Sequence, residues 1–183
     1  MTAWVWPAII LIAGLFAIKI TYVLSTAFAL PATQGALYVS TPKARIRAIL
    51  DEIAPQPGQR FLDIGCGDGR VLRAVARRFP EVTLIGYEVN PMAFFRARLA
   101  TLFRPIRICR KNFWKTRLDD ADIIFCYLFP DVLKRLAQKL RIEARPGTLV
   151  ISCNFPIPTL TPEKTIHPDG ALIHDPVYFY RIK

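Results

Sequence analysis

Apolar residues are spaced along this chain in two alternating ways. Short continuous apolar blocks favour buried strands, whereas apolar residues at helical spacing favour helices that pack on them. The blocks predict strands over 60–64, 82–89, 106–110, 121–128, 148–155 and 177–182. The helical spacing predicts helices over 43–53, 70–79, 91–103 and 131–140, and a proline-rich loop runs from 156 to 176. Apolar strands separated by helices indicate an α/β fold: a doubly wound, mostly parallel, Rossmann-like sheet covered on both faces.

The N-terminal segment has a different pattern, with Lys19 as the only charged side chain between Ala3 and Ala32. A helix needs about 20 apolar residues to cross a bilayer, and the stretch 4–24 supplies them, with aromatic residues near both ends. The next cations follow after residue 42, which favours a cytoplasmic domain. The sequence therefore predicts a single-pass membrane protein. Its expected parts are a transmembrane anchor over 1–30, a linker over 31–42 and a domain over 43–183.

This segment has two alternative interpretations, a cleaved signal peptide and a helix buried in a soluble protein. The sequence Ala27-Phe28-Ala29 resembles a signal-peptide cleavage site. The basic start typical of such peptides is missing, and the apolar stretch is longer than usual. The anchor is therefore favoured.

Composition excludes several other classes of protein. Of the 183 residues, 52% are hydrophobic and 21% charged, which excludes a disordered chain. Two histidines and four scattered cysteines leave little material for a metal site or a disulfide framework. The cysteines are interpreted as free thiols, and the formal net charge is +11.

A glycine-rich loop, Gly65-Cys66-Gly67-Asp68-Gly69, follows the first strand of the domain and precedes a helix. In doubly wound sheets, ligands bind beyond the carboxyl ends of the strands, and glycines there allow close approach of the backbone. The spacing differs from the dinucleotide fingerprint G-x-G-x-x-G, because Arg70 stands in the place of its third glycine. No G-K-[ST] follows, so a P-loop is excluded.

An acidic residue, Glu88, ends the second strand, 21 residues beyond Gly67. This is close to the spacing at which a carboxylate meets ribose hydroxyls, which favours a cofactor that contains a nucleoside. Taken alone, the glycine loop is also compatible with an ordinary tight strand-to-helix turn. Asp63, Asp68 and Glu88 in the expected elements favour the binding site.

These motifs resemble those of class I S-adenosylmethionine-dependent methyltransferases. Beyond the loop, the chain has Gly86–Pro91, Phe113–Lys115 and Phe155–Pro158 in the same order. Together with the apolar N-terminal segment, they are similar to the lysine methyltransferases that modify the ATP synthase c subunit and the adenine nucleotide translocase. The resemblance covers roughly residues 38–160.

The resemblance implies S-adenosylmethionine as cofactor and S-adenosylhomocysteine as product. It implies that Asp63 and the glycine loop hold the methionine part, that Glu88 binds the ribose, and that the segment 112–114 flanks the adenine. The implied cofactor-binding residues are Asp63, Gly65, Cys66, Gly67, Asp68, Gly69, Glu88, Asn112 and Phe113. Three positions depart from the family pattern: Cys66 replaces a common serine, Asn112 a common aspartate and Asn154 a usual arginine.

A lysine acceptor must be neutral to react, although its free pKa is about 10.4. A dry, aromatic channel beside a cation lowers that pKa. The segments after the fourth and fifth strands are expected to form such a channel beside the cofactor, with Tyr127 as a further hydrogen-bond partner. The channel residues are Phe129, Pro130, Asn154, Phe155 and Pro156. Simple loop packing is the alternative for these side chains.

Eight basic residues and no acidic one lie between Arg96 and Arg117. This basic run is expected to attract anionic lipid, with nucleic acid less favoured, and a solvated surface is the alternative. The leading hypothesis is an anchored methyltransferase acting on a lysine of a membrane protein. The alternatives are a methyltransferase of a lipid or quinone-like small molecule, one of nucleic acid, and a non-catalytic cofactor-binding membrane subunit.

Overall fold

A computed structural model describes residues 5–33, 40–168 and 175–183 of the chain. The described residues contain seven strands in one sheet, in the order β3-β2-β1-β4-β5-β7-β6. The strands are β1 Arg60–Ile64, β2 Thr83–Tyr87, β3 Ile106–Cys109, β4 Ile123–Cys126, β5 Leu149–Cys153, β6 Lys164–Ile166 and β7 Val177–Arg181. The pairings among β1 to β5 are parallel, and β7 pairs antiparallel with both β5 and β6.

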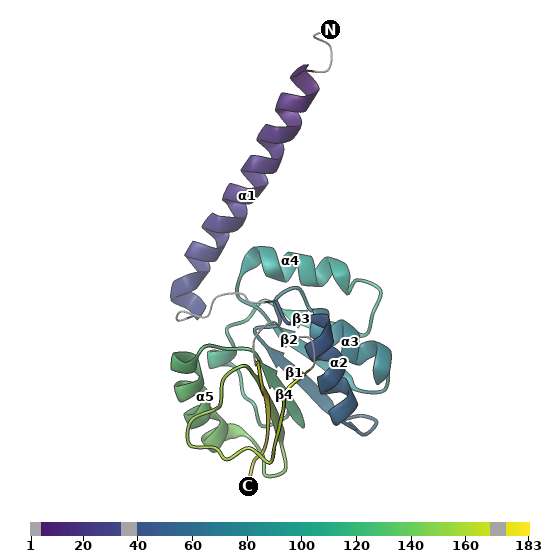
Figure 1. Cartoon of the computed structure of the whole chain (residues 1–183), viewed down its shortest axis with the longest axis vertical. Helices are drawn as coiled ribbons and strands as arrows, with labels where there is room; N and C mark the ends of the chain where they lie inside the picture. The colour runs from purple at the N-terminus through teal and green to yellow at the C-terminus, as the bar shows by residue number, and fades with distance from the viewer. Residues whose placement is uncertain (1–4, 34–39, 169–174) are drawn as a thin grey trace.

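Helices cover both faces of this sheet (Figure 1). The helices of the domain are α2 Lys43–Glu52, α3 Arg70–Arg78, α4 Pro91–Ala100 and α5 Pro130–Glu143, with the short 3-10 helix η1 Phe113–Lys115. The helices α2 and α3 lie together on one side of the sheet, and α5 lies on the other (Figure 1). The sheet therefore separates two apolar cores.

Alternate residues of each strand enter different cores, because successive side chains of a strand point to opposite faces. Phe61 and Phe125 pack with the apolar residues of α2 and α3. Leu62 and Ile124 pack with Leu133 and its neighbours on α5. Each strand of the sheet centre is thus buried on both sides, which explains its continuous apolar sequence.

The strand order reverses at the centre of the sheet, between β1 and β4. Ile64 pairs in register with Tyr87 of β2 on one side and with Cys126 of β4 on the other. Ligands of doubly wound folds bind at such a switch point, outside the carboxyl ends of the strands. The residues that follow β1, β2, β4 and β5 therefore meet at one edge.

The predicted α/β fold with a mostly parallel sheet is confirmed. The predicted strands and helices of the domain all appear, with ends that differ by a few residues. The strand β6 was missed, because it lies within the predicted loop 156–176 and its residues Lys164 and Thr165 are exposed. An exposed edge strand lacks the apolar block by which a buried strand is recognised.

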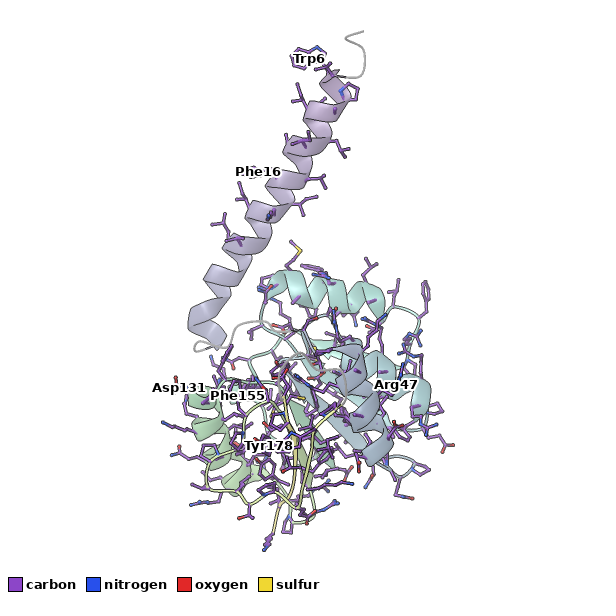
Figure 2. All side chains as sticks on the ribbon, in the orientation of Figure 1. Trp6, Phe16, Arg47, Asp131, Phe155 and Tyr178 are labelled. Atoms are coloured by element: carbon purple, nitrogen blue, oxygen red, sulfur yellow. The ribbon has the colours of Figure 1, made fainter. Side chains whose placement is uncertain are left out.

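The predicted transmembrane anchor is wrong. The helix α1, Val5–Thr33, projects away from the domain and contacts α4, and Trp6 and Phe16 lie on its isolated part (Figures 1 and 2). No helix among the described residues is both long and apolar enough to cross a membrane. The predicted single-pass membrane localisation is wrong for the same reason.

Some features of the N-terminal predictions lie outside the described residues. These are Trp4, the side chain of Tyr22, the side chains of the cleavage-like motif 27–29, and residues 34–39 of the predicted linker. The helix continues to Thr33, past the residue at which the linker was expected to begin.

Candidate cofactor and acceptor site

The glycine loop turns sharply between β1 and α3 because three of its residues adopt left-handed backbone conformations. The φ angles are 84° at Gly65, 55° at Gly67 and 71° at Gly69. Residues with a Cβ rarely adopt such angles, so glycine is required here. The N–H groups of Gly65 and Cys66 donate to the Tyr87 carbonyl at 2.9 and 3.0 Å, which ties the loop to the end of β2.

Glu88 links the glycine loop to the residues after β2. One carboxylate oxygen accepts the N–H of Gly67 at 2.9 Å, and the other accepts the N–H of Asn90 at 2.7 Å. The side chain is only 7% exposed. Each carboxylate oxygen has further lone pairs, so the same group can accept hydrogen bonds from a ligand.

Two other carboxylates lie in this region, on Asp63 and Asp68, and both side chains are buried. Burial raises the pKa of Asp63 well above its ordinary value, and the negative charges of Glu88 and Asp68 add to this effect. Burial also raises the pKa of Glu88, although the backbone N–H groups oppose the shift. Such a concentration of buried negative charge favours a cationic ligand.

Asp68 differs because it has its own cation. Burial acts to raise the pKa of Asp68, but the hydrogen bonds and charge of Arg70 outweigh it, so the pKa is lowered. The two side chains form an ion pair at 2.8 Å. Asp68 is therefore compensated within the chain. Asp63 and Glu88 form no ion pair with another described residue, so a cationic ligand would favour their ionised forms.

A small hollow, which we call the cofactor hollow, has among its lining residues Asp63, the loop residues 65–68, Arg70 and Tyr127. A sulfonium cofactor with an amino-acid part fits this region, since its positive charges can lie beside Asp63 in the hollow. Its hydroxyls can donate to Glu88, which is not among the lining residues of the hollow but is joined to the loop through Gly67. The left-handed loop leaves room for its approach without a Cβ. The residues present thus fit S-adenosylmethionine.

A second, aromatic hollow adjoins the first and shares Tyr127 with it. It has a volume of about 60 Å³ and is lined by Tyr127, Leu128, Phe129, Asn154 and Phe155. The rings of Phe129 and Phe155 lie 6.0 Å apart between centroids. The structure thus brings together three of the five predicted channel residues, Phe129, Asn154 and Phe155.

The turn after β5 presents Phe155 to this hollow. Asn154 adopts a left-handed conformation with a φ of 70°, which is rare outside glycine and which asparagine tolerates better than most residues. Its N–H donates to the Pro176 carbonyl at 2.8 Å, and the Ser152 hydroxyl donates to the Phe155 carbonyl at 2.7 Å. Backbone strain of this kind is concentrated at functional sites.

The remaining predicted site residues lie around these hollows rather than in them. Pro130 begins α5, and Pro156 is exposed beyond the turn. Asn112 begins η1, and its side-chain oxygen accepts the N–H of Trp114 at 3.0 Å. Phe113 is buried in the apolar core shared with α5. The Glu88 N–H donates to the Cys109 carbonyl at 3.1 Å, which brings the residues after β3 beside this edge.

Arg45 was missed as a site residue. Its side chain is 1% exposed, pairs with Asp175, and lies over the Tyr127 ring at 5.2 Å from the centroid. Burial acts to lower the pKa of Arg45, but Tyr127, Cys153 and Asp175 outweigh it, so the cation is retained. The available signal was its position four residues before the buried Ile49 on α2, which places an arginine on the apolar face.

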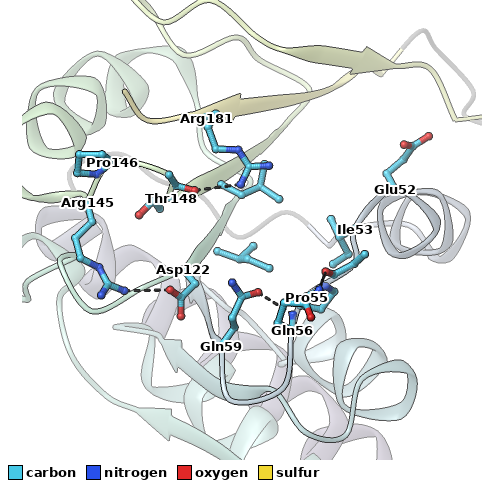
Figure 3. A pocket seen from close by; sticks show the side chains of 14 residues that line it. Glu52, Ile53, Pro55, Gln56, Gln59, Asp122, Arg145, Pro146, Thr148 and Arg181 are labelled. Atoms are coloured by element: carbon cyan, nitrogen blue, oxygen red, sulfur yellow. Dashed lines mark hydrogen bonds and ion pairs between the residues drawn. The ribbon is translucent and has the colours of Figure 1, made fainter.

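A cavity of about 570 Å³ lies at the opposite edge of the sheet (Figure 3). Its lining includes Asp122 and Thr148, which precede β4 and β5, and Asp122 pairs there with Arg145 at 3.1 Å. Ligands of this architecture bind at the carboxyl ends of the strands, so the smaller hollows at the other edge form the candidate site.

The eight residues of the basic run are all exposed and extend from α4 through β3 to η1 and the residues that follow it. Arg117 pairs with Asp119 at 2.6 Å. The lipid or nucleic-acid partner of this run stays a prediction. The four cysteines are free thiols, and Cys66, Cys126 and Cys153 are buried.

Comparison with known proteins identifies relatives of this chain. A protein-lysine N-methyltransferase of Saccharolobus islandicus is 29% identical over 79% of this chain and 92% of its own length. The adenine nucleotide translocase lysine N-methyltransferase of Mus musculus is 34% identical over 68% of this chain and 56% of its own length. A second mouse enzyme, the lysine N-methyltransferase of the ATP synthase c subunit, is 29% identical over 81% of this chain and 62% of its own length. The chain thus spans less than two thirds of each mouse enzyme.

Among solved structures, an RNA methyltransferase of Salinibacter ruber in complex with S-adenosylhomocysteine matches with a TM-score of 0.72. It is 26% identical and covers 79% of this chain and 94% of its own. Fold, glycine loop and buried carboxylates together define a class I methyltransferase that uses S-adenosylmethionine. A sequence model of the ANTKMT methyltransferase domain matches residues 63–164, and the chain belongs to that family.

Proposed function

We propose that this enzyme methylates the side-chain amine of a lysine in a protein. The observation that carries the proposal is the aromatic hollow, which shares Tyr127 with the cofactor hollow. Because the two hollows share Tyr127, an amine that enters the aromatic hollow beside Phe129 and Phe155 would lie next to the cofactor hollow. The protein-lysine activities of the relatives support the same acceptor.

When bound, S-adenosylmethionine supplies a methyl group that an amine lone pair can attack, the sulfur leaving with the bonding electrons and the surplus amine proton going to solvent. The residues of the chain align the two reactants, and orientation of this kind can supply much of the rate. Phe129 and Phe155 exclude water from the amine, which favours its neutral form. Arg45 lies over the Tyr127 ring and pairs with Asp175, so it holds Tyr127 in position beside the amine.

The side-chain oxygens of Tyr127 and Asn154 are the proposed hydrogen-bond acceptors for the amine. Both residues line the aromatic hollow. Asn154 is held by the strained turn after β5, so its position is set before the acceptor arrives. Asp63, the glycine loop and Glu88 are proposed to hold the cofactor, with residues 43–183 acting as the catalytic domain.

The proposal is tested by incubating the purified full chain with methyl-labelled S-adenosylmethionine and a host-cell extract. The protein, lipid and nucleic-acid fractions are then separated, and the labelled protein is hydrolysed. Label recovered as methylated lysine supports the proposal, and label confined to lipid or to RNA would overturn it. The Glu88→Ala variant serves as the control for label transfer by contaminating enzymes.

A further inference from the structure

A groove with a basic rim lies between α2 and α3, outside the site described above. Its volume is about 520 Å³, within the range of about 300–1,000 Å³ typical of ligand sites. The two helices lie side by side on one face of the sheet (Figure 1). The groove is lined by Lys43, Ile46, Arg47, Leu50, Arg70, Arg73, Ala74 and Arg77.

The rim of this groove is strongly positive. Five of its eight lining residues are cationic, and no carboxylate is among these described residues. Arg70 pairs with the Asp68 side chain, and Arg73 donates to the Asp68 carbonyl at 2.6 Å. Lys43, Arg47 and Arg77 are exposed and take part in no ion pair with another described residue. The charge of these three is therefore available to a partner.

The remaining lining residues, Ile46, Leu50 and Ala74, are apolar. Ile46 is 7% exposed, and Leu50 packs partly buried against the same core. The groove thus offers a small apolar contact between cationic side chains. A partner that fits it carries negative charges on either side of an apolar group.

The groove is continuous with the catalytic edge through shared residues. Arg70 lines both the groove and the cofactor hollow, and Tyr127 lines both the cofactor hollow and the aromatic hollow. The groove and the aromatic hollow share no lining residue, so a segment docked in the groove would reach the proposed site of methyl transfer past the cofactor hollow that lies between them. Arg47 lies on the α2 side of the domain, and Phe155 lies toward α5 (Figure 2).

We infer that this groove docks an acidic segment of the protein substrate, a role that rests on the proposed lysine methylation. Carboxylates of the segment pair with Lys43, Arg47 and Arg77, and an apolar side chain contacts Ile46 and Leu50. Single-stranded nucleic acid is disfavoured, because its binding sites combine cations with aromatic stacking platforms, and the described lining of this groove contains no aromatic residue. Charge complementarity mainly speeds encounter and sets specificity, so the groove selects lysines that lie near acidic sequence.

The test uses the full chain and three fluorescent probes. The first is a peptide with one lysine, alternating glutamate and leucine residues, and a net negative charge. The second has glutamine in place of glutamate, and the third is a single-stranded RNA of similar length. Binding is measured by fluorescence anisotropy for the parent protein, for R47E/R77E, and for the matched variant K134E/R141E. The matched variant makes the same change in net charge with two exposed cations of α5, on the other face of the sheet.

The acidic peptide is expected to bind more tightly than its neutral counterpart, with a dissociation constant that rises about tenfold in R47E/R77E and less than about twofold in K134E/R141E. S-adenosylhomocysteine affinity and melting temperature stay unchanged in both variants. Equal binding of the two peptides, equal losses in both variants, or a groove-dependent preference for the RNA would overturn the inference. Lysine methylation of extract protein that is unaffected by R47E/R77E would retain the proposed function and remove only the docking role.

Discussion

The guanidinium of Arg45, on α2, lies 5.2 Å from the ring centroid of Tyr127, which follows β4 and lines both hollows. The same arginine pairs with Asp175, at the start of the segment that leads into β7. One buried cation therefore joins α2, β4 and the C-terminal segment behind the proposed acceptor site. Because Arg45 meets the acceptor site through Tyr127, we assign it the role of a positioning residue.

Replacing Arg45 with methionine is expected to destabilise the protein by about 2 kcal/mol, measured by denaturant unfolding. Removal of one partner from a buried ion pair costs about 3–5 kcal/mol, and the 28% exposure of Asp175 reduces the penalty here. Arg47→Met on the same helix is the control, since an exposed side chain there changes stability by less than about 0.5 kcal/mol. Equal unfolding energies for the two variants would contradict the role assigned to Arg45.

Replacing Glu88 with alanine is expected to weaken S-adenosylhomocysteine binding by at least about tenfold in calorimetry. A hydrogen bond to a charged group contributes about 1.5–3 kcal/mol, and the variant also frees the N–H groups of Gly67 and Asn90. Glu88→Gln keeps one acceptor oxygen and should retain more affinity than Glu88→Ala. Unchanged affinity in Glu88→Ala would remove the ribose-binding role of this residue.

Replacing Asp63 with asparagine is expected to raise the melting temperature of the cofactor-free protein at pH 7 while weakening cofactor binding. The pKa of Asp63 is raised in the folded state, so the folded protein binds this proton more tightly than the unfolded chain does. The stability of the parent protein should therefore fall as pH rises above the ordinary aspartate pKa of about 3.9 toward the raised value. Asp63→Asn should flatten this dependence.

Cofactor affinity should have the opposite pH dependence, because a cationic ligand favours the ionised carboxylate. The measurement is a pair of profiles, one of melting temperature and one of dissociation constant, for the parent and Asp63→Asn. A loss of stability in Asp63→Asn at pH 7 would show that the buried charge is already compensated within the protein.

Replacing Gly86 with alanine is expected to destabilise the protein by about 1–3 kcal/mol, the usual cost of overpacking. A Cβ at this position would lie 2.7 Å from both the Cys66 sulfur and the Leu72 Cδ1. Gly14→Ala is the control, because a Cβ there meets nothing within 4 Å. Thermal unfolding compares the two, and a melting temperature unchanged in Gly86→Ala would show that Cys66 and Leu72 can move aside.

Replacing Phe155 with alanine is expected to lower turnover on the protein substrate far more than it lowers S-adenosylhomocysteine affinity. The ring lines the aromatic hollow and faces Phe129, and it is absent from the cofactor hollow. Phe103→Ala, at a side chain that is 95% exposed, should leave both quantities unchanged. Parallel losses of turnover and affinity in Phe155→Ala would assign the ring to the cofactor.

Local signals in the chain were sufficient to predict the sheet and the positions of the glycine loop and of Glu88 at neighbouring strand ends. Each of these depends on residues close in sequence: apolar blocks, glycines at a strand end, and a carboxylate at the end of the next strand. The edge strand β6 and the role of Arg45 depend on distant partners, Phe179 and Asp175. At the N-terminal segment a local signal predicted too much. Its apolar composition predicted a membrane-spanning helix, and none was found among the described residues.

The locations of residues that are close in sequence can thus be predicted from the sequence, because the regular geometry of a strand or helix places them at the same strand end or on the same helix face. Two shared positions were decided only by folding. Arg70 lines both the basic groove and the cofactor hollow, and Tyr127 lines both the cofactor hollow and the aromatic hollow. These positions required β4 to pair with β1, and α2 to pack on α3. Long-range packing of this kind has no signature in a short window of sequence, because the contacts join residues that are dozens of positions apart.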